Sequence, residues 1–141
     1  MSDVSYPTLG QTVFDTTDAR ALAEFYRQLL GFDYRSGDEP PAPGTDDVRG
    51  RDWLVLLDPS GKRGLAFQQV DVLPASTWPD PVIPQQLHLD LTVPDRASLD
   101  VQHERAMALG ARLLVDEADT AGEPIRVYAD PAGHPFCIFV D

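Results

Sequence analysis

The sequence predicts an α+β fold built from two tandem β-α-β-β-β modules. Each half of the 141-residue chain has the same order of an extended segment, a helical segment and a glycine, and each half contains one Asp-Pro-x-Gly turn. A segment with four prolines lies between the halves at residues 71–86, where neither a helix nor a central strand would tolerate them. We therefore expect one domain over 1–141, with a first module at about 8–70, a linker at 71–86 and a second module at about 87–141.

The first module begins with an extended segment, QTVFDTTD at 11–18, that ends in Asp18. A carboxylate in this place accepts the free amides of a first helical turn, so Asp18 is the expected N-cap. Gly31 follows where a left-handed C-cap is wanted. Between them, apolar residues recur at the helical spacing i, i+3, i+4 and i+7, namely Leu22, Phe25, Tyr26 and Leu29.

The second module repeats this order. Its extended segment HLDLTVPD ends in Asp95, and Gly110 closes the helical segment that follows. The apolar stripe is weaker than in the first half and consists of Leu99, Ala106 and Leu109. Good helix formers fill the remaining positions, so we expect a second helix here.

Each half ends with the same turn between two strands. The turn at 58–61 (DPSG) follows WLVLL, and the turn at 130–133 (DPAG) follows IRVYA. Proline at the second position and glycine at the fourth suit a type I hairpin turn. The sequence therefore predicts final strands at 64–70 and 135–140.

Composition excludes several classes of protein. Hydrophobic residues make up 43% of the chain, enough for a packed core, and the net charge of −12 would repel nucleic acid. The longest apolar runs, 53–57 and 136–140, are too short to span a membrane. The N-terminus has no basic and apolar segments of a secretory signal, and Cys137 is the only cysteine, so no disulfide can form within the chain. We expect a cytoplasmic protein.

Strand alternation predicts a sheet face that carries polar side chains. His88 and Asp90 share one face of their strand, opposite the apolar Leu89 and Leu91. The same face of the other strands carries Gln11, Val13 and Asp15 in the first module, and Cys137 and Phe139 in the second. This face either binds a ligand or is simply solvated, as in many antiparallel sheets.

The order of these elements, together with LAFQQV at 65–70, PQQLHLDLTVPD at 84–95 and RVYADPAGHPFCIFV at 126–140, resembles the vicinal oxygen chelate superfamily. That superfamily includes glyoxalases, bleomycin-resistance proteins and extradiol dioxygenases, and the chain is similar to its glyoxalase-like subfamily from about Leu9 to Val140. The resemblance implies a curved, cup-shaped mixed sheet with helices outside. It also implies a small molecule in the cup, often beside a divalent metal, and a homodimer, whose interface would cover open sheet edges.

The resemblance places the family's four metal ligands at Gln11, Gln68, His88 and Cys137. The family uses His and Glu at these positions, and both Glu positions are lost here. Two neutral amides contribute little charge, and divalent ions such as Mg²⁺ or Mn²⁺ prefer charged oxygen ligands. We therefore expect no cofactor and no tightly bound metal; if a metal is held, these four residues would hold it.

Two functions remain open. One is a glyoxalase-like lyase or dioxygenase acting on a small carbonyl, diol or aromatic substrate, with His88 and Gln11 as catalytic residues. The other is a sequestering binder like the bleomycin-resistance proteins. In either case Gln68, Asp90 and Cys137 are the expected ligand-binding residues, although a lone cysteine is more often a small core side chain. Four aromatic residues are able to wall the pocket or to pack in the core: Trp53, Trp78, Tyr128 and Phe139.

The segment 36–51 is the remaining long connection. It is rich in Pro, Gly and Asp, has no period, and has no counterpart in the second half. Long irregular connections tend to be lids or disordered segments, so we expect a mobile flap over the first module's half of the cup, or an idle surface loop. On this expectation, replacing 38–49 with a short Gly-Ser link weakens ligand binding and leaves the melting temperature nearly unchanged.

Overall fold

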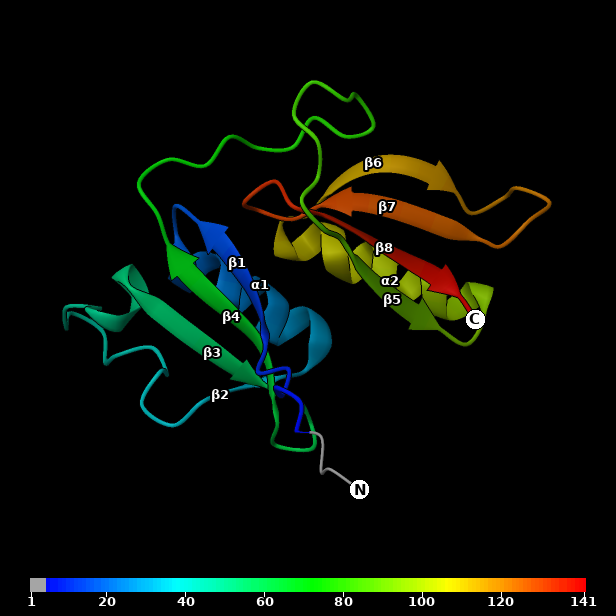
Figure 1. Cartoon of the computed structure of the whole chain (residues 1–141). Helices are drawn as coiled ribbons and strands as arrows, with labels where there is room; N and C mark the ends of the chain where they lie inside the picture. Colours follow the sequence, from blue (N-terminus) through cyan, green and yellow to red (C-terminus); the bar gives the residue numbers. More distant parts are fainter. Residues whose placement is uncertain (1–4) are drawn as a thin grey trace.

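The computed structural model describes residues 5–141 and contains the two predicted modules (Figure 1). The first module consists of β1 (Thr12–Thr16), α1 (Ala19–Leu30), β2 (Asp33–Tyr34), the short 3-10 helix η1 (Arg49–Arg51), β3 (Trp53–Leu57) and β4 (Arg63–Gln69). The second consists of β5 (Leu89–Val93), α2 (Arg96–Leu109), β6 (Arg112–Glu117), β7 (Ile125–Ala129) and β8 (Pro135–Val140). The predicted α+β class and the repeated β-α-β-β-β order are confirmed.

The eight strands form two open four-stranded mixed sheets with the same topology, β1-β4-β3-β2 and β5-β8-β7-β6. In each module the first and last strands lie side by side and run parallel, and the other neighbours are antiparallel. This pairing places Asp15 opposite Gln68 in the first sheet and Asp90 opposite Cys137 in the second. Residues far apart in the sequence therefore meet on one face of each sheet.

The helices begin and end where the sequence predicts. The Asp18 carboxylate accepts the amide of Ala21 at 3.0 Å, and the Asp95 carboxylate accepts the amide of Ser98 at 2.7 Å. Gly31 ends α1 with a φ of 68°, a left-handed conformation that costs glycine little. The second helix buries only Leu99 and Ala106, in agreement with its weaker apolar stripe.

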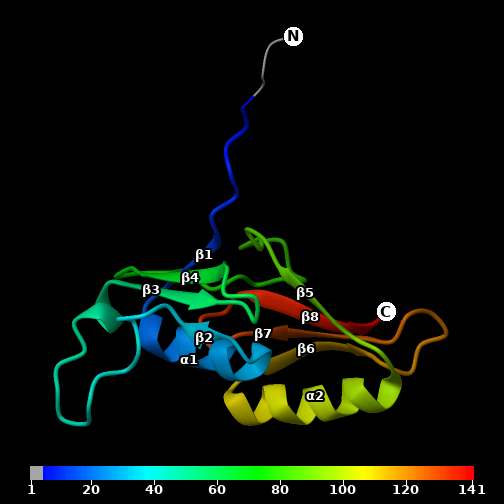
Figure 2. The same ribbon diagram turned by 90° about the horizontal axis from the view of Figure 1, so that it is seen from below.

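Both helices cover the same side of the two sheets, and the opposite side carries no helix (Figure 2). The core lies between the helical layer and the sheets and is dominated by rings. Its fully or almost fully buried aromatic residues are Phe14, Phe25, Tyr26, Phe67, Tyr128 and Phe136. The uncovered side of the sheets is called the open face below.

The two modules are joined by polar contacts as well as by this core. The Tyr26 hydroxyl on α1 donates to the carboxylate of Asp130, in the turn before β8, at 2.6 Å. In the same turn, His134 Nε2 donates to the backbone carbonyl of Asp15 at 2.7 Å, and its ring packs on Phe14. The Asp-Pro-x-Gly turn of the second module therefore also holds the first module.

The segment 36–51 does not form the expected flap over the cup. It runs along the outer edge of the first sheet, beyond β3 (Figure 1). Asp38 is completely buried, and its carboxylate accepts the backbone amide of Val55 on β3 at 2.9 Å. Arg20 on α1 donates to the carbonyl of Asp38 at 2.7 Å and to the carboxylate of Asp47 at 2.8 Å. The segment is thus packed against the sheet edge and the first helix.

Across residues 5–141, neither helix combines the length and the apolar character that crossing a lipid bilayer requires.

Candidate functional site

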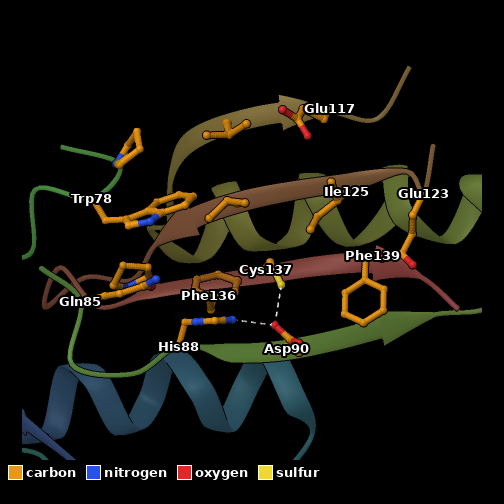
Figure 3. A pocket seen from close by; sticks show the side chains of 14 residues that line it. Trp78, Gln85, His88, Asp90, Glu117, Glu123, Ile125, Phe136, Cys137 and Phe139 are labelled. Carbon is orange, nitrogen blue, oxygen red and sulfur yellow. Dashed lines mark hydrogen bonds and ion pairs between the residues drawn. The ribbon is translucent and has the colours of Figure 1, made fainter. Parts of the chain in front are cut away.

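A pocket of about 560 Å³ lies on the open face of the second sheet (Figure 3). All four strands of this sheet line it, and the linker between the modules contributes Trp78, Pro79 and Gln85. Pockets of this size accommodate small organic ligands. The lining residues in the strands are Asp90, Val115, Glu117, Ile125, Val127, Pro135, Phe136, Cys137 and Phe139, with His88 just before β5 and Glu123 just before β7.

Two rows of neighbouring residues cross this face of the sheet. In the first row Asp90, Cys137, Val127 and Val115 are paired in turn across β5, β8, β7 and β6. The second row lies two residues away along each of these strands: Phe139 pairs with Ile125, and Ile125 pairs with Glu117. Because side chains alternate along a strand, every second residue of these strands points into the pocket.

The polar wall of the pocket is a connected group of three side chains. The Asp90 carboxylate lies 3.1 Å from His88 Nε2 and accepts a hydrogen bond from the Cys137 thiol at 2.9 Å (Figure 3). The structure therefore brings together three of the residues that the sequence singled out, on β8 and in and just before β5. Such a group can accept or donate hydrogen bonds to a ligand and can move a proton.

Cys137 acts here as a hydrogen-bond donor. Its side chain is only 6% exposed. Burial, and then the hydrogen bond to the Asp90 carboxylate, raise the pKa of the Cys137 thiol to about 12. Since the thiolate is the nucleophilic form of cysteine, a thiol with this pKa is a poor nucleophile near neutral pH. The geometry favours a buried positioning role for Cys137 over covalent catalysis.

Aromatic residues close the two ends of the pocket, but they are only partly those expected. Trp78 in the linker and Phe139 on β8 line it. Tyr128, an expected ligand-binding residue, is fully buried on the opposite face of β7, where its ring stacks on Phe136. Its hydroxyl lies 2.8 Å from His103 Nδ1 on α2. Assigning Tyr128 to the pocket is wrong because its neighbour Val127 takes the open face.

The expected site residues of the first module lie elsewhere. Gln68 is exposed on β4, Trp53 is paired with it on β3, and Gln11 precedes β1. None of the three lines the pocket of the second module. Gln11 Oε1 is a buried oxygen that has no hydrogen-bond partner within residues 5–141. The catalytic role of Gln11 and the ligand contacts of Gln68 and Trp53 therefore stay predictions, because none of these residues reaches the pocket within a single chain.

The residues present do not fit a tight metal site. In the part of the chain that the structure describes, no group of three His, Cys, Asp or Glu side chains is placed to share an ion. Of the four positions implied by the resemblance, Gln11 and Gln68 carry neutral amides and lie on the other module. His88 and Cys137 are then the only two of the four that this pocket offers, fewer than the three or four ligands of a tight zinc site.

Sequence reasoning missed the two carboxylates at one end of the pocket, Glu117 and Glu123. Glu117 follows Val115 by two residues on β6, so the alternation used for the other strands would have found it. Glu123 lies in the connection before β7, where no periodicity applies. Glu123 lines the pocket because the connection between β6 and β7 brings it there, and no local pattern predicts this.

Comparison with known proteins agrees with this fold. A family model described as "Glyoxalase-like domain" matches residues 11–139. No curated protein matches the chain.

Three solved structures illustrate the similarity. A glyoxalase/dioxygenase from Nostoc punctiforme is 20% identical, with a TM-score of 0.65 over 100% of this chain and 98% of that one. A glyoxalase/bleomycin resistance protein/dioxygenase family enzyme from Burkholderia phytofirmans PsJN is 17% identical, with a TM-score of 0.64 over 93% and 96%.

The third structure is a mutant of the fosfomycin resistance protein FosX from Listeria monocytogenes, complexed with Mn(II) and 1S,2S-dihydroxypropylphosphonic acid. It is 16% identical, with a TM-score of 0.66 over 96% of this chain and 93% of that one. At these identities the structures show a shared fold, and the family model covers nearly the whole chain. The chain therefore belongs to the glyoxalase-like domain family.

Proposed function

We propose that this protein binds a small organic molecule in the pocket of the second module without a tightly held metal. One observation carries the proposal: an apolar pocket of about 560 Å³ in which His88, Asp90 and Cys137 form a connected polar wall. Pockets that are mostly apolar, with a few convergent polar groups, are typical small-molecule sites. The single, buried cysteine supports a reducing compartment such as the cytoplasm.

Filling the pocket with a larger side chain should weaken ligand binding. Val127 lines the pocket, so Val127→Trp should weaken the binding of a neutral probe, 4-phenylbutan-1-ol, at least tenfold in titration calorimetry. Val101→Trp is the matched control, because Val101 is 56% exposed on α2 and lies outside the pocket. Wild-type protein that shows no saturable binding, or two variants that bind the probe equally well, would contradict the proposal.

The metal-free part of the proposal has its own test. Protein purified without chelator should hold well under one equivalent of Zn, Mn, Fe, Ni or Mg by elemental analysis, because the donor set lacks the family's two carboxylates. A stoichiometric metal that is lost in His88→Ala would overturn this. That result would instead support a metal-dependent lyase or dioxygenase; a FosX structure of similar fold contains Mn(II).

A metal-independent enzyme is a second candidate, favoured by the contact of 3.1 Å between His88 Nε2 and Asp90. Asp90 would accept a proton from a substrate, which would leave the negative charge on the substrate, and would later return that proton; His88, through its contact with Asp90, would orient the carboxylate. His88→Ala and Asp90→Asn would then abolish turnover. For a sequestering binder, the same variants would change only affinity.

We also propose that the protein is a homodimer in which the open faces are covered. The open face of the first module carries Val13, which is 37% exposed, and nearby Gln11 Oε1 has no hydrogen-bond partner among residues 5–141. Light scattering at high micromolar concentration should report about twice 15.5 kDa, and Val13→Arg should shift the mass toward the monomer. A wild-type monomer under these conditions would refute the dimer.

A further inference from the structure

We propose that the ligand of this pocket is an organic cation, an amine joined to an aromatic or apolar body. This inference rests on the proposed small-molecule binding and adds the chemical class of the ligand. It is drawn from the charges of the pocket residues and from their arrangement along the sheet.

The pocket contains three carboxylates and no Lys or Arg. Asp90, Glu117 and Glu123 line it, and His88 is the only other titratable side chain there besides the Cys137 thiol. Within residues 5–141, neither Glu117 nor Glu123 forms an ion pair.

Two carboxylates on the helical side of the same module, in contrast, form ion pairs with arginines. Asp100 contacts both Arg96 and Arg126, at 3.1 and 3.0 Å, and Asp116 contacts Arg126 at 3.2 Å. Arg96 and Arg126 thus neutralise these two acids behind the sheet. The two glutamates at the pocket remain available to a ligand.

The two glutamates and Trp78 lie at opposite ends of the pocket (Figure 3). Glu117, Ile125 and Phe139 form one row across the sheet, and Glu123 lies at the same end, whereas Trp78 lies at the opposite end (Figure 3). Between these ends the floor is apolar, with Val115, Ile125 and Val127. An elongated ligand would place its ammonium group beside the two glutamates and the Phe139 ring, and its apolar body toward Trp78.

Both interactions at the acidic end favour a cation. An ammonium group is attracted by the carboxylates and by the face of the Phe139 ring, and both attractions strengthen as the ligand excludes water. A carboxylate or phosphonate would meet two like charges with no cation to offset them. On the first module, β1 presents Val13 and Asp15 on its open face, so a partner chain docking by this strand would add an acid rather than a base.

Three probes of equal length test the inference: 4-phenylbutylamine, 4-phenylbutan-1-ol and 4-phenylbutanoate. We expect titration calorimetry to show the amine binding at least tenfold more tightly than the alcohol, and the acid binding more weakly than both. The double variant Glu117→Gln, Glu123→Gln should lower the affinity for the amine about tenfold and change that for the alcohol less than threefold.

A control variant must distinguish the effect of the pocket glutamates on affinity from the effect of the protein's net charge of −12. The double variant Asp33→Asn, Glu104→Gln removes the same two charges from exposed positions on β2 and α2, outside the pocket. It should change the affinity for the amine less than twofold. If it lowers this affinity as much as the pocket variant does, the preference comes from the overall charge and the inference is wrong.

The remaining outcomes distinguish the inference from the proposed function. If the alcohol binds and the amine binds no better, or the acid binds best, the pocket is a binding site but the cationic ligand is excluded. If none of the three probes binds, the proposed function fails and the inference fails with it. Thermal melts of both double variants verify that each is folded.

Discussion

Replacing Asp38 with alanine is expected to destabilise the protein by about 2–4 kcal/mol, because a buried amide loses its charged acceptor and two arginine contacts are removed. The Asp38 carboxylate is fully buried and accepts three hydrogen bonds or ion contacts. Val55 N donates at 2.9 Å, Arg49 at 2.7 Å, and Arg35 lies 3.1 Å away. Alanine would leave the Val55 amide at the sheet edge without its acceptor.

The exposed Asp46 in the same segment provides the matched control. It contacts only Arg51, which is itself exposed, so Asp46→Ala should leave the unfolding midpoint nearly unchanged. Urea denaturation followed by circular dichroism measures both variants. Equal midpoints for the two would mean that the segment 36–51 does not stabilise the sheet edge. Shortening 38–49 to a Gly-Ser link should also lower stability strongly, contrary to the expectation from the sequence.

The second large effect is expected at Asp130. Its carboxylate accepts the Tyr26 hydroxyl at 2.6 Å and the backbone amides of Ala132 and His134 at 2.9 and 3.0 Å. Asp130 is 4% exposed, so alanine would leave three donors in a buried place without an acceptor. We expect a loss of about 2–4 kcal/mol in the free energy of unfolding, with Tyr26 as the buried partner that makes the loss large.

The duplicated turn supplies the control for this prediction. Asp58 occupies the same position in the first module and accepts the amides of Ser60 and Lys62, but it is only partly buried and, within residues 5–141, has no tyrosine partner. Asp58→Ala should therefore cost much less than Asp130→Ala in the same denaturation experiment. Tyr26→Phe should reproduce part of the Asp130→Ala loss. If the two aspartates prove equivalent, the contact between the modules contributes nothing beyond the turn itself.

Several features of the fold could be predicted because they depend on neighbours in the sequence. The N-caps Asp18 and Asp95, the glycine stops and the two Asp-Pro-x-Gly turns each act within a few residues, so residue types alone specify them. Strand alternation likewise placed His88 and Asp90 on the opposite face of the sheet from Leu89 and Leu91. These local signals also led to the confirmed β-α-β-β-β repeat.

The loop 36–51 shows where such reasoning stops. Its prolines, glycines and acids are typical of an exposed connection, and nothing local indicates that one of its four acids is buried. The burial of Asp38 depends on the edge of β3 and on arginines that come from β2, η1 and α1 or lie near them. Contacts with residues distant in the sequence determine whether an acidic side chain is solvated or buried.

The sequence by itself determined the two modules, their helices and turns, and the polar face of β5, because each is specified by local spacing and residue type. Only the tertiary structure decided which polar and aromatic residues share a pocket. Trp78 reaches it from a linker without periodicity, Glu117 and Glu123 meet at the end of a hairpin, and Tyr128 turns away into the core. The physical reason is that a pocket is made where separate strands and a linker converge, and strand pairing with helix packing, not local preference, sets that convergence.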